Sequence, residues 1–204
     1  FFKASDDDNR INMSSVAPIF PMNVIAPNDE RAISTANAYI ERYGERVLGD
    51  GMHDRAFPWS AGVLGTILAG QGRGDLVWTA LQGARPTICN FGGMTEVMEN
   101  GEWNMQYFGT AQGACCTAIH EMLLQSRDDQ IELFPALPSS WNEVSFERLR
   151  ASGFVVSAAY QSGAVEWTAQ NASSVPLTRQ LCYGDHEVTL ELQPGETRSA
   201  AWVR

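Results

Sequence analysis

The longest regular pattern of hydrophobic positions lies between Met105 and Trp141. Within it, small and apolar residues recur at three- and four-residue spacing over about four turns, which predicts a helix with one apolar face. These positions are Ala111, Ala114, Cys115, Ala118, Ile119, Met122 and Leu123. Small residues let neighbouring helices approach closely, so we expect this helix to lie inside a group of helices.

Three segments upstream also have helical patterns. One is expected to begin at Asn28 or Asp29, where a side chain can cap the helix, and to end at Gly44. The run from Trp59 to Ala69 is almost entirely apolar, which predicts a helix buried on all sides. A further helix is expected from Asp75 to near residues 83–86. One buried and one more exposed helix, joined by a short turn, is the unit that an α-toroid repeats.

Beyond Trp141 the apolar positions recur with period two. Alternation over 154–158 and 165–169, on either side of Gln161-Ser-Gly, predicts a hairpin. Further strands are expected over 177–183, 187–192 and 197–203. We therefore predict an α+β multidomain protein: a partial toroid of antiparallel helices in residues 1–136, followed by an all-β, sandwich-like module in residues 137–204.

Composition restricts the function classes. The chain has 204 residues, of which 44% are hydrophobic and 19% charged, as expected for a folded chain. Its formal net charge of -10 argues against a nucleic-acid partner, because phosphates require a basic surface. No run approaches the roughly 18 apolar residues of a membrane span, so we expect no membrane partner. Phe1–Met13 is too charged for a signal peptide, and we expect a trimmed, processed or longer protein.

The four cysteines suggest no metal site. Cys115 and Cys116 are adjacent, which fits neither a disulfide framework nor a tetrahedral zinc pattern. We expect the cysteines to be small core residues, and we predict no metal and no cofactor.

Two short segments match the acceptor pattern for N-linked glycosylation. They are Asn12-Met-Ser and Asn171-Ala-Ser. The pattern is short enough to occur by chance, and it matters only in a secreted protein of a eukaryote.

Several spaced segments together resemble glycoside hydrolase family 95. Glu121–Ser126 (EMLLQS), Ile131–Trp141 (IELFPALPSSW) and Phe146–Phe154 (FERLRASGF) are similar to the end of that family's catalytic domain and the start of its C-terminal β domain. The upstream segments that come in the family's order are Pro18-Ile-Phe-Pro, Pro27-Asn-Asp-Glu and Trp59-Ser-Ala-Gly. The resemblance covers residues 14–204.

This family consists of α-L-fucosidases and related α-L-galactosidases with an (α/α)6 barrel. The resemblance implies that residues 1–136 are the C-terminal portion of such a barrel and that residues 137–204 are its β domain. Because about four helical patterns cannot close the ring, we expect an upstream segment or another chain to supply the remainder. Without it, the apolar faces of helices 59–69 and 108–126 would be exposed.

The resemblance also implies inverting hydrolysis, in which a Glu protonates the leaving oxygen and an Asp activates water. The family's acid lies upstream of the residues present. Counting back from Glu121 to the position of the family's base reaches Thr110, which is not a general base. We therefore expect a nearby carboxylate to act instead, among Glu96, Glu99 and Glu102. We favour Glu96 as the catalytic residue, because it lies between a flexible turn and the central helix.

Neighbouring residues suit an oligo- or polysaccharide, because aromatic rings stack on sugars and polar side chains bond their hydroxyls. The candidates after the glycine-rich loop are Glu102, Trp103, Asn104, Gln106 and Tyr107. A second cluster precedes the buried helix and contains His53, Asp54, Arg55 and Trp59. In the alternative interpretation of this cluster, Asp54 caps the helix, Arg55 forms a surface ion pair and Trp59 belongs to the core.

The sequence thus predicts a glycosidase of secreted or periplasmic location, with two alternatives. One is a polysaccharide lyase of the α-toroid and β-sandwich type, in which Tyr107 or His53 acts as base and Arg55 neutralises a uronate. The other is a sugar-binding fragment without catalysis. An unsaturated, ultraviolet-absorbing product would indicate the lyase.

Overall fold

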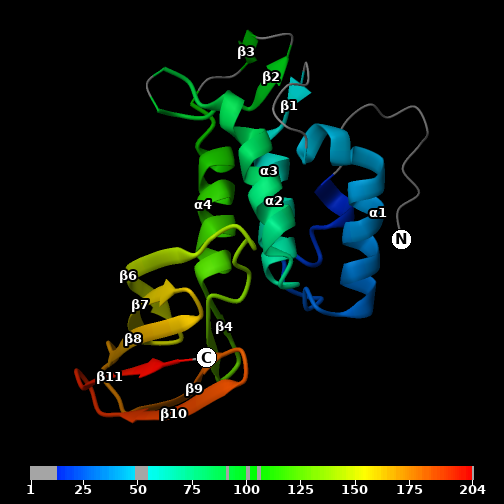
Figure 1. Cartoon of the computed structure of the whole chain (residues 1–204). Coiled ribbons are helices and arrows are strands. Elements are labelled where there is room, and N and C mark those ends of the chain that lie inside the picture. Colours follow the sequence, from blue (N-terminus) through cyan, green and yellow to red (C-terminus); the bar gives the residue numbers. More distant parts are fainter. Residues whose placement is uncertain (1–12, 49–54, 91, 100–101, 105–106, 204) are drawn as a thin grey trace. The chain divides into compact units, whose positions relative to one another are not determined.

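The computed structural model describes residues 13–48, 55–90, 92–99, 102–104 and 107–203 (Figure 1). The chain divides into two compact units, residues 1–119 and residues 120–204. The predicted domain ranges, 1–136 and 137–204, stay predictions. No helix among the described residues has the length and hydropathy needed to cross a bilayer.

The first unit contains most of the helices and one small sheet (Figure 1). Its helices are α1 (Glu30–Val47), α2 (Pro58–Ala69), α3 (Gly74–Ala84) and the greater part of α4 (Gly109–Leu123), with 3-10 turns η1 (Met13–Ser15) and η2 (Arg85–Thr87). The strands β1 (Arg55–Ala56), β2 (Val97–Glu99) and β3 (Glu102–Asn104) pair in that order as an antiparallel sheet.

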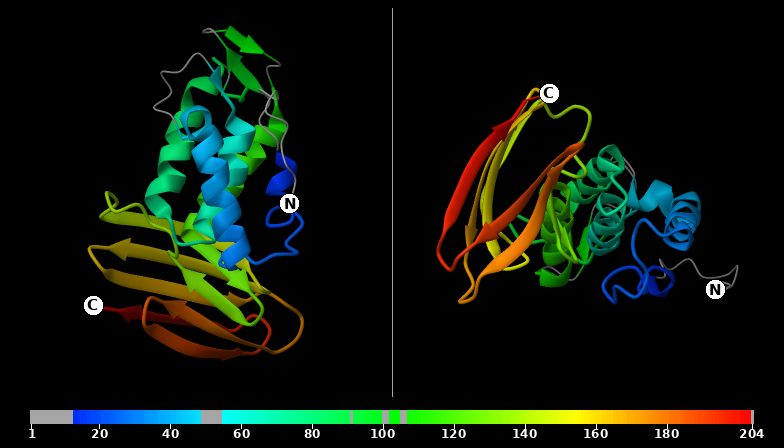
Figure 2. Two further views of the ribbon diagram at one scale, coloured as in Figure 1. Left: turned by 90° about the vertical axis from the view of Figure 1, so that its right-hand side faces the viewer. Right: turned by 90° about the horizontal axis from the view of Figure 1, so that it is seen from below.

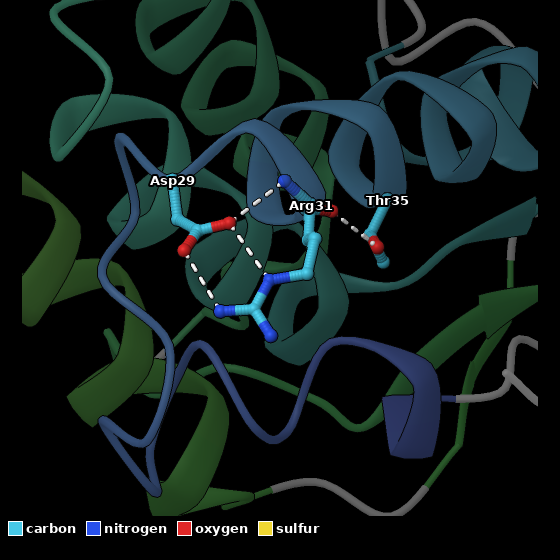
Figure 3. A network of polar contacts seen from close by, with 3 residues as sticks. All are labelled: Asp29, Arg31 and Thr35. Atoms are coloured by element: carbon cyan, nitrogen blue, oxygen red, sulfur yellow. Dashed lines mark hydrogen bonds and ion pairs between the residues drawn. The ribbon is translucent and has the colours of Figure 1, made fainter.

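Helix α1 begins where the capping signal predicts. The Asp29 carboxylate accepts a hydrogen bond from the Arg31 backbone N–H at 2.9 Å, which satisfies a helix-terminal donor (Figure 3). The same carboxylate pairs with the Arg31 guanidinium at 2.8 Å. These contacts lower the pKa of Asp29 to about 2, chiefly through the side-chain hydrogen bond from Arg31. One turn further on, Thr35 Oγ1 donates to the Arg31 carbonyl at 2.7 Å.

Helix α2 is the core of the first unit. Every residue from Ser60 to Ala69 is buried, as predicted, and only Trp59 reaches the surface of this helix, at 39% exposure. Its small residues face those of α4: a Cβ on Gly65 would lie 3.1 Å from the Ala118 Cβ. Close approach of the two backbones therefore depends on small side chains on both helices.

The second unit consists mainly of two four-stranded sheets (Figure 2). One has the order β10-β9-β5-β4 and comprises β4 (Leu124–Arg127), β5 (Gln130–Leu133), β9 (Leu177–Tyr183) and β10 (His186–Leu192); only β5 and β9 are parallel in it. The other has the order β11-β8-β7-β6, is antiparallel throughout, and comprises β6 (Glu143–Ala151), β7 (Phe154–Gln161), β8 (Ala164–Asn171) and β11 (Thr197–Trp202).

The buried faces of these two sheets share one hydrophobic core. Leu181 and Leu190 of one sheet belong to the same cluster as Val156 and Trp167 of the other. The predicted hairpin is confirmed: β7 and β8 pair in register, and all six predicted apolar positions are buried. This alternation of buried and exposed residues is what a sheet with one covered face requires.

The predicted partial toroid is wrong. The described residues contain only four short helices and two sheets of four strands, with a third, smaller sheet, so the chain has an α+β fold. Helix α2 is covered within its own unit, and the expected exposed apolar face on 59–69 is absent from it. Hydrophobic periodicity identifies a helix and its buried face. It does not determine which other elements cover that face or how many helices surround it. Because the toroid is wrong, it gives no reason to expect another segment or chain to complete a ring.

The end of the central helix also differs from the prediction. The pattern predicts a helix to Ser126, whereas α4 ends at Leu123 and β4 follows at once. Leu124–Arg127 pairs with Gln130–Leu133 across a turn in which Asp128 has a positive φ of 50°. Cross-strand pairing thus overrides local helical propensity at this point.

Candidate functional site

The small sheet of the first unit contains one residue of the first predicted cluster and three of the second (Figure 1). Strand β2 lies between β1, which contains Arg55, and β3, which contains three of the predicted site residues. In the Cα register, Glu99 lies opposite both Arg55 and Glu102. The structure therefore places Arg55 and the segment 102–104 on opposite sides of β2 in one sheet.

This sheet leads directly into the first turns of two helices. Strand β1 ends at Ala56 and α2 begins at Pro58, while α4 begins five residues after the end of β3. The start of α2 contacts the middle of α4, where the Cys115 thiol lies 3.4 Å from the Pro58 carbonyl oxygen.

The loop before β2 is held by backbone hydrogen bonds. Cys89 N–H donates to the Gly93 carbonyl at 2.7 Å, and Gly92, with a φ of 84°, turns the chain between them. Thr95 is buried, and its N–H donates to the Thr87 carbonyl at 3.0 Å. Glu96 follows immediately and is half-buried. Its backbone lies between Thr95, which this hydrogen bond holds, and the paired strand β2.

Two aromatic candidates differ in how they are held. Trp103 is half-buried, and its indole Nε1 donates to the Pro86 carbonyl at 3.2 Å, which fixes the ring against η2. Tyr107 is 72% exposed and has a positive φ of 68° directly before α4. The next residue, Phe108, is tied to the Met94 carbonyl by its N–H at 2.7 Å. Tyr107 is thus an exposed ring on a fixed backbone.

The remaining predicted residues are placed as follows. Glu102 is exposed at the start of β3, and Asn104 ends that strand. Trp59 is exposed, so the alternative interpretation in which it belongs to the core is wrong. His53, Asp54 and Gln106 lie outside the described residues.

The cysteine prediction is correct in part. Cys89 and Cys115 are buried, whereas Cys116 is exposed and Cys182 is half-buried. Burial raises the pKa of the Cys115 thiol to about 12, and this thiol is therefore not a nucleophile near neutral pH. Within the described part of the chain, no group of three or more His, Cys, Asp and Glu side chains is arranged to hold a metal ion.

A hollow that the sequence did not predict lies in the second unit. A shallow groove of about 590 Å³ follows the sheet β11-β8-β7-β6 and is lined by residues including Ser157, Glu166, Thr168 and Ser199. Thr168 and Ser199 hydrogen-bond each other at 2.8 Å. The groove is wide open and contains none of the predicted site residues.

No protein-family model matches the chain, and no curated protein matches it. The resemblance to glycoside hydrolase family 95 therefore stays a prediction that rests on the segments quoted above.

Proposed function

We propose that the protein is a glycoside hydrolase that cleaves a glycosidic bond in an oligo- or polysaccharide. The observation that supports this best is the sheet β1–β2–β3, which holds Arg55 and the sugar-compatible residues Glu102–Asn104 in one small sheet, close in the sequence to the beginning of α2 and α4. Binding sites commonly consist of a few convergent polar groups beside aromatic surface. Here the convergence arises from strand pairing between segments far apart in the sequence.

Glu96 is the proposed catalytic base. Its carboxylate accepts a proton from the water that attacks the anomeric carbon, while a separate acid protonates the leaving oxygen. A base must be held in position to act, and the backbone on both sides of Glu96 is fixed by the Thr95 hydrogen bond and by β2. The proposal assigns no residue of this chain as the acid.

Substrate contacts are assigned to the residues around this carboxylate. Tyr107 offers an exposed ring for stacking on a sugar, and Trp103 offers a ring that its hydrogen bond to Pro86 holds in place. Glu102 and Asn104 supply acceptors and donors for hydroxyl groups. Arg55, which shares the sheet with them, would bind a further hydroxyl or support a carboxylate.

Product analysis tests this proposal. The protein is incubated with neutral oligosaccharides, with a uronate polysaccharide, and with aryl α-L-fucoside and α-L-galactoside, the substrates that the family resemblance implies. New reducing ends without ultraviolet absorption support hydrolysis. An unsaturated, ultraviolet-absorbing product would instead identify a lyase. Saccharide binding in titration calorimetry without any product would identify a non-catalytic sugar-binding protein.

A further inference from the structure

Asn171 matches the N-glycosylation pattern with Ser173, but it is among the least accessible residues of the second unit. It ends β8 and is 0% exposed. The enzyme that attaches a glycan must reach the side-chain nitrogen Nδ2, and the sugar must then occupy space beside it. Neither requirement is met in the folded chain.

Hydrogen bonds hold the Asn171 side chain at both its amide nitrogen and its amide oxygen. The two Nδ2 protons are donated to the carbonyl oxygens of Val175 and Leu192, each at 2.9 Å. Oδ1 accepts from the N–H of Ser173 at 2.9 Å. The Ser173 hydroxyl lies 2.8 Å from Oδ1 and 2.7 Å from the Val175 carbonyl oxygen, so its one proton serves both acceptors.

These bonds connect the two sheets of the second unit. Asn171 lies in the sheet β11-β8-β7-β6, whereas Leu192 ends β10 of the other sheet. The bonds to Ser173 and Val175 join Asn171 to the loop that follows β8 and hold that loop in a turn, as short Asn and Ser side chains commonly do. The Asn-Ala-Ser pattern therefore has a local structural explanation: position 171 requires the amide and position 173 the hydroxyl.

We infer that Asn171-Ala172-Ser173 is a structural clasp and that an N-linked glycan on Asn171 and the native second unit exclude each other. Attachment replaces one Nδ2 proton by a sugar, which leaves one donor for two carbonyls, the buried one of Leu192 and the part-buried one of Val175. An unsatisfied buried carbonyl is destabilising, and the 0% exposed site has no room for the sugar. The chain reaches its native state only where Asn171 stays unmodified. This inference is independent of the proposed function.

Secretion from eukaryotic cells tests the exclusion. The chain is expressed with a secretion signal and with Asn12→Gln, which removes the other acceptor pattern, and occupancy at Asn171 is measured by peptide mass spectrometry. The matched control carries Asp185→Asn with Glu187→Thr, which places an acceptor in the exposed turn between β9 and β10. We expect secreted, cooperatively melting chains to carry a glycan at position 185 in the control and none at Asn171. Any chain modified at Asn171 should be retained and non-native.

A secreted chain that melts cooperatively with a glycan on Asn171 would overturn the inference. A second measurement tests the clasp without glycosylation: Asn171→Ala, made in bacteria, should lower the melting temperature by roughly 5–15 °C, because the buried Leu192 carbonyl loses its donor and the loop bonds to Val175 and Ser173 are lost. Ser173→Ala, which removes only the bonds of the hydroxyl, should lower it less. An Asn171→Ala protein that melts like the wild type would also contradict the inference.

Discussion

Gly62 of α2 packs directly against the backbone of Ala114 in α4, so closely that a Cβ on Gly62 would lie 2.5 Å from the Ala114 carbonyl carbon. A contact of that length cannot be relieved by turning a side chain, because the atoms it meets belong to the backbone. The two helices would have to separate. Since both helices begin beside the sheet β1–β2–β3, this contact also supports the position of the candidate site.

Gly62→Ala should therefore destabilise the protein by about 1–3 kcal/mol, the usual range for overpacking a core. Gly113→Ala is the matched control, because it changes a glycine of α4 whose Cβ would meet nothing within 4 Å. Alanine is the better helix former by about 0.8–1 kcal/mol, so this control should be neutral or stabilising. Urea unfolding of the two variants measures both effects. Equal stability of the two variants would show that α2 and α4 are not packed as described.

The variant Tyr107→Gly distinguishes the effect of the exposed Tyr107 ring from the effect of its backbone conformation. Tyr107 has a φ of 68°, a conformation that favours glycine, so relief of backbone strain should offset at least part of what the loss of the side chain costs in stability. Saccharide affinity should fall because the stacking ring is lost. Titration calorimetry and thermal melting measure the two effects on the same sample. Undiminished saccharide affinity in Tyr107→Gly would remove Tyr107 from the site.

Glu121 should make stability depend on pH. Burial raises the pKa of this carboxyl above its ordinary value of 4.5, although Arg127 acts in the opposite direction. His120 Nδ1 lies 4.0 Å from the Glu121 carboxylate, too far for a strong ion pair. The folded chain therefore binds the Glu121 proton more tightly than the unfolded chain, and the associated stability is present below pH 4.5 and lost as the pH rises through the folded-state pKa.

Glu121→Gln should consequently raise the melting temperature near pH 7 and have little effect near pH 4. His120 contributes with the opposite sign, because burial lowers its pKa and its protonation in acid destabilises the folded chain. The comparison is therefore made between wild type and variant at each pH, so that His120 is common to both. A variant that is less stable than the wild type at pH 7 would refute this account of Glu121.

The cap of α1 gives a second pH effect, in the opposite direction. The pKa of Asp29 is lowered to about 2, so its contribution is present above the ordinary value of 3.8 and is lost as the pH falls toward 2. Asp29→Asn keeps a side-chain acceptor for Arg31 N–H but loses the charge, whereas Asp29→Ala loses both. Thermal melting monitored by circular dichroism should rank the wild type first, Asp29→Asn second and Asp29→Ala last at pH 7. Identical melting of all three would show that the cap is not formed.

Local patterns in the sequence predicted the parts of the fold that local physics determines. The buried run of α2, the cap at Asp29 and the hairpin of β7 and β8 each follow from a few neighbouring residues. The strand at Leu124–Arg127 and the parallel pairing of β5 with β9 could not be predicted, because both depend on partners distant in the sequence. The toroid failed for the same reason, since helix periodicity carries no information about the partner of a buried face.

The candidate site also combines features that local sequence predicts with features that depend on distant partners. The residue types near Glu96 and Trp59 were recognisable from sequence as suited to a sugar. Their relation was not, because Arg55 and Glu102 are related only through the intervening strand β2, and the sequence names Glu99 of that strand as a candidate base without indicating how the strand pairs. The clasp at Asn171 was visible only as an acceptor pattern, since its hydrogen bond to Leu192 crosses between sheets.

Turnover by Glu96→Gln tests the central claim most directly, since the substitution keeps the shape of the side chain and removes its basicity. On a saccharide that the wild type hydrolyses, kcat should fall by at least about 100-fold, the usual loss when a general base is removed, with an unchanged melting temperature. Glu41→Gln, an exposed carboxylate of α1 in the same unit, is the control and should keep full activity. Wild-type kcat in Glu96→Gln would contradict the assignment of the catalytic site to this sheet.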